Sequence, residues 1–142
     1  MTCFWDGILS ALSPDFKSRN QISNPHSLVS FFKKVESKTN LSRRGEHPAL
    51  LHQGSPLSDQ QVKEFLQWIR DYDASGIRNG HLTSTCDPFL SVLAGYCDCS
   101  VEHLYNKKHL VRYESPFNHA KLWLRFASDR GHFWFVKREH RP

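Results

Sequence analysis

The feature that most constrains the fold is a change in the spacing of the apolar residues near position 100. Before this point, apolar side chains recur every three or four residues, which predicts amphipathic helices. From residue 101 onward they alternate with polar residues, which is typical of half-buried strands. Helices first and strands last favour an α+β fold, in which N-terminal helices pack on one side of a small, mostly antiparallel C-terminal sheet. A chain of 142 residues has room for a single domain, residues 1–142, with its own core.

The first helix is expected over residues 4–12, where the apolar positions follow helical spacing. Thr2 or Cys3 occupies the cap position, and Pro14 lies just beyond the end. The sequence therefore places Cys3 at the N-terminus of an apolar helix.

Three further helices have a recognisable start. Asn24 is a favoured N-cap residue, and Pro25 suits the first helical position. Ser58 and Gln61 have the spacing of a capping box. Pro88 is tolerated in the first turn of a helix, so it is expected to mark the start of the fourth.

Between the second and third helices the apolar pattern disappears. Residues 39–57 are rich in polar residues, Gly and Pro, and are expected to form a flexible loop. Beyond the fourth helix, alternation predicts strands over residues 101–105, 110–113, 122–126 and 132–137. Residues 128–131 read Ser-Asp-Arg-Gly, a hairpin turn between the last two strands.

The composition narrows the class of protein. No apolar run is long enough to span a bilayer and no signal segment opens the chain, so a soluble protein of the reducing cytoplasm, without a membrane partner, is expected. Four cysteines in such a compartment are not expected to form disulfides. The net charge of +5 comes from scattered basic residues, which does not favour nucleic acid as a partner. The oligomeric state cannot be inferred, and no cofactor is expected.

Two weaker patterns stay open. Cys97 and Cys99, with His103 and His109 nearby, could bind zinc, although a single residue between the two thiolates is closer than the usual spacing. Aromatic residues on the predicted strands have basic neighbours, as in base-stacking surfaces, but Phe126 and Trp134 are more simply interpreted as core. The aromatic residues concerned are Trp123, Phe126 and Trp134.

Cys3 and His132 form the strongest candidate for chemistry. The partial positive charge at a helix N-terminus favours the thiolate form of a cysteine, and its amides can stabilise an oxyanion. His132 opens an apolar strand, a rigid element that can hold a base, and the preceding Gly131 would allow a close backbone approach. A thiolate beside an imidazole is the pair that a thiol hydrolase needs.

Three segments carry a resemblance to a known family. The sequence Cys-Phe-Trp-Asp-Gly-Ile over residues 3–8 resembles the helix start of the OTU (ovarian tumour) cysteine peptidases. Residues 87–94 followed by 101–105 resemble the helix and strand that precede the catalytic histidine of that family, and Gly-His-Phe-Trp over residues 131–134 resembles its Gly-His-aromatic strand.

This resemblance implies a papain-like OTU fold and a cysteine peptidase that cleaves after ubiquitin or a ubiquitin-like modifier. Cys3 would be the nucleophile and His132 the general base. Members often carry Asn or Asp two residues after the histidine, where this chain has Trp134. The orienting residue is therefore left open between Asp129 and Asp6. The alternative is a non-catalytic relative that binds protein or nucleic acid.

Overall fold

The computed structural model describes residues 2–35, 51–73, 75, 83–97, 99–114 and 121–141. Five helices are present in this part of the chain: α1 (Cys3–Ala11), α2 (Pro14–Arg19), α3 (Pro25–Val35), α4 (Asp59–Asp71) and α5 (Thr83–Cys97). They precede or interrupt six strands, β1 (Leu51–His52), β2 (Ser55–Pro56), β3 (Ser100–Tyr105), β4 (His109–Glu114), β5 (Leu122–Ser128) and β6 (Phe133–His140). The mixed α+β class is confirmed.

The local helix signals act as predicted. The Ser58 hydroxyl accepts a hydrogen bond from the Gln61 amide, and the Gln61 side chain accepts one from the Ser58 amide, which completes the capping box of α4. Asn24 accepts a hydrogen bond from the amide of Ser27 at the start of α3. The short helix α2 was not predicted. It begins at Pro14, and proline is favoured at the first position of a helix. The preceding Ser13 is the N-cap, and its hydroxyl accepts a hydrogen bond from the amide of Phe16.

The predicted start of the fourth helix is wrong. Helix α5 begins at Thr83, so Pro88 lies inside the helix rather than in its first turn. A proline here removes one helical hydrogen bond. The side chains of Phe89 and Leu90, which follow the proline, are fully buried. Their burial offsets the cost of the proline and keeps the helix continuous past it.

The sheet has six strands in the order β2-β1-β4-β3-β5-β6. Neighbouring strands are antiparallel except β3 and β5, which run parallel with Val101 opposite Leu124. The sheet is therefore mixed, and it is larger than the C-terminal sheet that the sequence predicted. Strands β1 and β2 form a hairpin within the expected loop 39–57, of which residues 39–50 lie outside the described part.

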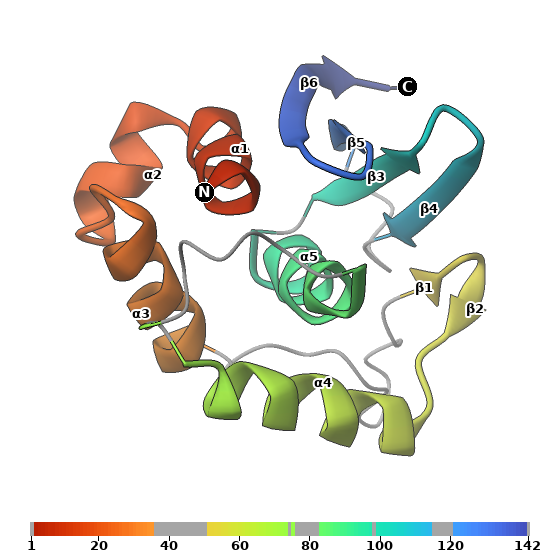
Figure 1. The fold of residues 1–142 in the computed structure, drawn as a ribbon, viewed down its shortest axis with the longest axis horizontal. Coiled ribbons are helices and arrows are strands. Elements are labelled where there is room, and N and C mark those ends of the chain that lie inside the picture. Colours follow the sequence, from red (N-terminus) through yellow and green to blue (C-terminus); the bar gives the residue numbers. More distant parts are fainter. Residues whose placement is uncertain are drawn as a thin grey trace.

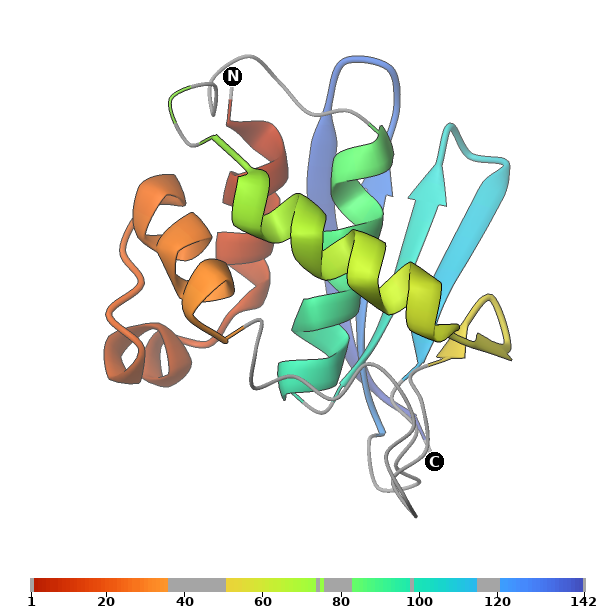
Figure 2. The ribbon, with the colours of Figure 1, turned by 90° about the horizontal axis from the view of Figure 1, so that it is seen from below.

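Figure 1 shows α5 at the centre, with the sheet curving around one side of it and α1, α3 and α4 around the other. Figure 2 shows α4 crossing in front of α5. No helix of the described residues covers the other face of the sheet (Figures 1 and 2). Helices on one face are what the sequence predicted.

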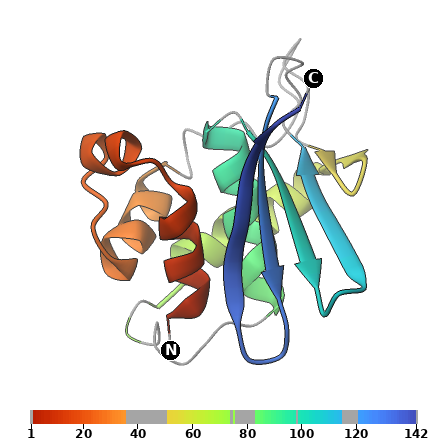
Figure 3. The ribbon, with the colours of Figure 1, turned by 90° about the horizontal axis from the view of Figure 1, so that it is seen from above.

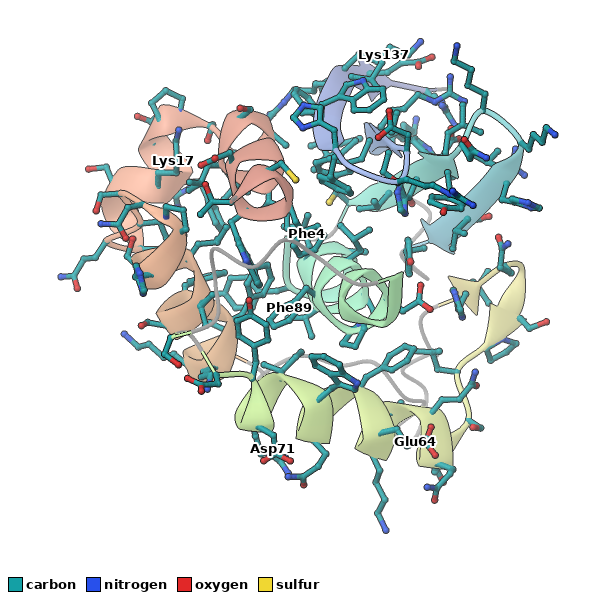
Figure 4. All side chains as sticks on the ribbon, in the orientation of Figure 1. Phe4, Lys17, Glu64, Asp71, Phe89 and Lys137 are labelled. Atoms are coloured by element: carbon teal, nitrogen blue, oxygen red, sulfur yellow. The ribbon has the colours of Figure 1, made fainter. Side chains whose placement is uncertain are left out.

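Aromatic side chains join the helices to the sheet. The Trp5 ring lies 4.8 Å from Phe89 of α5, and the Phe4 ring lies 4.8 Å from Phe133 of β6, both edge to face. Figure 4 shows Phe4 and Phe89 in the interior, whereas Glu64, Asp71 and Lys137 point outward. The core thus connects α1 directly with α5 and with the last strand.

None of the described helices is both long and apolar enough to cross a membrane.

Candidate active site

The start of α1 holds Cys3 in the first helical position. Thr2 is the N-cap residue, and its carbonyl accepts the first helical hydrogen bond from the amide of Asp6, at 2.9 Å. The Thr2 hydroxyl donates to the Asp6 carboxylate at 2.6 Å. Cys3 is half-buried, so its thiol is partly accessible. The predicted position of Cys3 at a helix N-terminus is confirmed. Cys3 therefore lies among the first-turn amides of α1, which carry partial positive charge.

A compact turn presents His132 at the start of β6. The Asp129 carboxylate accepts hydrogen bonds from the amides of Gly131 and His132, at 3.0 and 2.9 Å. The Asp129 amide donates to the carbonyl of His132 at 2.9 Å. The imidazole is exposed, while the next residue, Phe133, is buried. The turn therefore fixes the backbone of His132 and leaves its ring on the surface.

Helix α1 lies along the edge strand β6 and runs in the same direction. Near the helix start, a Cβ atom built on Gly7 would lie 2.8 Å from the Phe133 ring, so helix and strand are in direct contact there. Near the helix end, the Arg138 guanidinium donates to the carbonyl of Ala11 at 2.6 Å. Figure 3 shows the N-terminus of the chain and the β5–β6 turn at the same end of the molecule. This alignment places Cys3, one turn before Gly7, at the same end as His132.

Cys3 and His132 line one pocket of about 420 Å³ between α1 and β6. The remaining lining residues come from the same two elements and the cap: Thr2, Asp6, Gly7, Ser10, Phe133, Trp134 and Phe135. Two residues from opposite ends of the sequence thus share one cavity. A thiol and an imidazole in one partly open pocket can carry out nucleophilic chemistry on a carbonyl group.

The close backbone approach occurs at Gly7 and not at Gly131. A Cβ atom on Gly131 would have no heavy atom within 4 Å, so that prediction was wrong. Gly7 was missed, although a glycine inside a helical pattern is itself a signal, because it lowers helix stability unless a close contact requires it. The contact of Gly7 with Phe133 is what lets α1 approach β6.

The two candidates for the orienting residue differ in their surroundings. Asp129 already accepts two backbone hydrogen bonds within the turn. Asp6 lines the pocket with Cys3 and His132, and its carboxylate accepts the hydroxyl of Thr2. Within the described part of the chain, the His132 ring makes no hydrogen bond, and its neighbour is the indole of Trp134.

The alternative sites are not assembled in the described residues. No group of three or more His, Cys, Asp or Glu side chains that could hold a metal is found there. Cys99 is buried, and the ring of His103 contacts the hydroxyl of Ser128 at 2.6 Å. The side chain of Cys97 lies outside the described residues. Within the described residues, the zinc pattern is therefore not assembled.

The aromatic residues on the strands divide between core and surface. Phe126 is fully buried, as predicted. Trp134 is exposed, which corrects its assignment to the core. Trp123 packs beneath the guanidinium of Arg141, 4.2 Å from its ring centre. These side chains therefore do not form one continuous stacking surface.

The face of the sheet that carries no described helix buries one carboxylate that the sequence did not reveal. Glu102 is 2% exposed and pairs with Arg125 at 3.0 Å and with Arg141 at 2.5 Å. Burial raises the pKa of Glu102, but the hydrogen bonds and charges of Arg141 and Arg125 outweigh it and hold the pKa below its usual value. This cluster ties β3, β5 and the end of β6 together and lies outside the Cys3 pocket.

Comparison with protein families, with curated proteins and with solved structures found no match.

Proposed function

We propose that the protein is a cysteine-dependent hydrolase of the OTU type. It cleaves isopeptide or peptide bonds after ubiquitin or a ubiquitin-like modifier, with Cys3 as nucleophile and His132 as general base. A reduced thiol is required, which suits the reducing cytoplasm.

The shared pocket of Cys3 and His132 is the observation that carries the proposal. The helix start supplies a partly accessible thiol, and the turn before β6 supplies an exposed imidazole. The direct packing of Gly7 on Phe133 holds the two elements in contact. Cys3 also packs partly against the hydrophobic core, but its thiol and the His132 ring both keep access to solvent.

The chemistry follows from these groups. The imidazole of His132 accepts the proton of the Cys3 thiol, and the thiolate attacks the carbonyl carbon of the scissile bond. Negative charge then develops on the carbonyl oxygen, which first-turn amides of α1 can stabilise. The imidazolium gives its proton to the leaving amine, and a thioester remains on Cys3. A water molecule, deprotonated by His132, hydrolyses the thioester and releases the carboxylate and the thiol.

The assignment of ubiquitin as the substrate rests on the resemblance to the OTU peptidases around Cys3 and His132. The pocket geometry supports thiol-dependent hydrolysis as the class of reaction. The choice of ubiquitin or a ubiquitin-like modifier as substrate comes from the motif similarity alone.

The test is a covalent-capture experiment. The protein is incubated with ubiquitin that carries a C-terminal thiol-reactive warhead, and adducts are measured by intact mass. We expect a single adduct on the wild type, none on Cys3→Ala, and a strongly reduced rate on His132→Ala. Cys99→Ala is the matched control, because that thiol is buried and should leave the adduct unchanged.

Two other outcomes separate the parts of the proposal. Without a ubiquitin adduct, rapid alkylation of Cys3 by iodoacetamide at about neutral pH, where an ordinary thiol is mostly protonated, would keep the thiol hydrolase and reject ubiquitin. Slow alkylation of Cys3 as well would reject the enzyme and leave the non-catalytic binding module.

A further inference from the structure

We infer that Trp134 is the positioning residue for the His132 ring, acting through stacking rather than through a hydrogen bond. The inference rests on the proposed function, because it assigns a role within that reaction. The two ring centres lie 5.5 Å apart with an angle of 19° between the planes. Both rings line the pocket that contains Cys3.

The strand geometry produces this stack. Residues 132 and 134 are two positions apart, and side chains at this spacing lie on the same face of an extended chain. Opposite Trp134 on β5 stands Ala127, whose small side chain leaves room for an indole. Phe133, between them, turns inward and is buried against α1, which fixes the strand that carries both rings.

The exposure of Trp134 is unusual for so large an apolar side chain. It is 38% exposed, although burying an indole would stabilise the fold. Its stacking partner is a histidine whose ring has no hydrogen-bond partner among the described residues. The carboxylate nearest in sequence, that of Asp129, is occupied by the amides of Gly131 and His132. The indole face is thus the group in contact with the imidazole.

Stacking can do what a hydrogen-bonding partner does in other thiol hydrolases. It restricts the rotation of the imidazole, so that a larger fraction of molecules has the ring oriented for proton transfer. It also favours the imidazolium that forms when His132 takes the proton of Cys3, because a cation is attracted to an aromatic face. Both effects act on the chemical step and not on substrate affinity.

The test compares Trp134→Leu with Trp134→Phe. Leucine keeps an apolar side chain but has no aromatic face, whereas phenylalanine restores one. With a fluorogenic ubiquitin substrate, we expect Trp134→Leu to lower kcat about fivefold to tenfold with KM nearly unchanged, and Trp134→Phe to recover most of the loss. Trp68→Leu is the matched control. Trp68 is equally exposed, at 37%, and lies on α4 outside the pocket.

A spectroscopic readout tests the stack without catalysis. In the wild type, the ring current of Trp134 should move the NMR signal of the His132 ring Cε1–H upfield, and Trp134→Leu should reverse the shift. Unaltered kinetics in Trp134→Leu, a change in KM alone, or a His132 signal that does not respond would each overturn the inference. A responding signal in a wild-type protein that hydrolyses nothing would instead refute the proposed function and leave the stack as geometry alone.

Discussion

The substitution Gly7→Ala tests the contact on which the pocket depends. Gly7 lies in the middle of α1, where alanine would ordinarily stabilise a helix by about 0.5–1 kcal/mol. Here the new methyl group would lie 2.8 and 2.9 Å from two carbons of the Phe133 ring. Favourable carbon–carbon contacts lie at about 3.5–4.0 Å, so helix and ring must separate by roughly 0.7 Å or more.

The Phe133 ring cannot easily give way. It is 1% exposed and packs 4.8 Å from Phe4, 5.2 Å from Phe126 and 5.3 Å from His103. Overpacking of this kind costs about 1–3 kcal/mol. After subtracting the gain in helix propensity, we expect the free energy of unfolding to fall by about 0.5–2 kcal/mol.

The displaced helix should also carry Cys3 away from His132. A misplacement of about 1 Å between reacting groups can cost on the order of a hundredfold in rate. We expect the rate of warhead labelling to fall at least about tenfold in Gly7→Ala, measured beside urea unfolding of the same preparation. Gly131→Ala is the control, since its methyl group meets open space, and its free energy of unfolding should change by less than about 0.5 kcal/mol. A Gly7→Ala protein that is as stable as wild type and labels at the same rate would refute the reasoning.

Two further substitutions probe the contacts around β6. Arg138→Gln removes the cation that binds the last turn of α1 through the Ala11 carbonyl, and urea unfolding should show a loss of about 1–2 kcal/mol; an unchanged midpoint would mean that α1 is held without this contact. Glu102→Gln leaves the two half-exposed arginines without their carboxylate and should cost about 1–3 kcal/mol at pH 7. Because the arginines hold the folded-state pKa of Glu102 below the usual value of about 4.5, this stabilisation is present above about pH 4.5 and is lost as the pH falls through the folded-state pKa. The stability difference between wild type and Glu102→Gln, followed by urea unfolding from pH 7 downward, should therefore shrink in acid, and a difference that stays constant would contradict the assignment.

The features that the sequence predicted well are those with a local cause. The capping box of Ser58 and Gln61 and the cap of Asn24 need only residues three positions apart. The position of Cys3 in the first turn of α1 follows from the apolar spacing of a single segment. Pro88 shows the limit of such reasoning, because its local penalty was overcome by the burial of the residues that follow it.

The features that were missed depend on partners far away in the sequence. Strands β1 and β2 have two residues each, too few to show alternation, and β1 is held by pairing Leu51 with Glu114 of β4. The turn between them uses Gln53 at a φ of 55°, a residue that does not signal such a turn. Alternation likewise identified β3 and β5 as strands without revealing that they pair in parallel. Glu102 stood at a polar position of β3, and only the assembled sheet brings its arginines to it.

The candidate site depends both on local sequence signals and on contacts between distant parts of the chain. Each of its two residues carries a local signal, but their meeting depends on the direction in which α1 lies along β6. Had the helix run the opposite way, Cys3 would lie near Arg138, at the far end of the strand from His132. The contacts of Gly7 with Phe133 and of Arg138 with Ala11 together exclude that orientation. Because these contacts join the first helix to the last strand, the pocket depends on packing between distant parts of the chain, so loss of labelling by the warhead should follow global unfolding in urea rather than precede it. Labelling that disappears at a lower urea concentration than the fold itself would show that α1 detaches independently of the sheet.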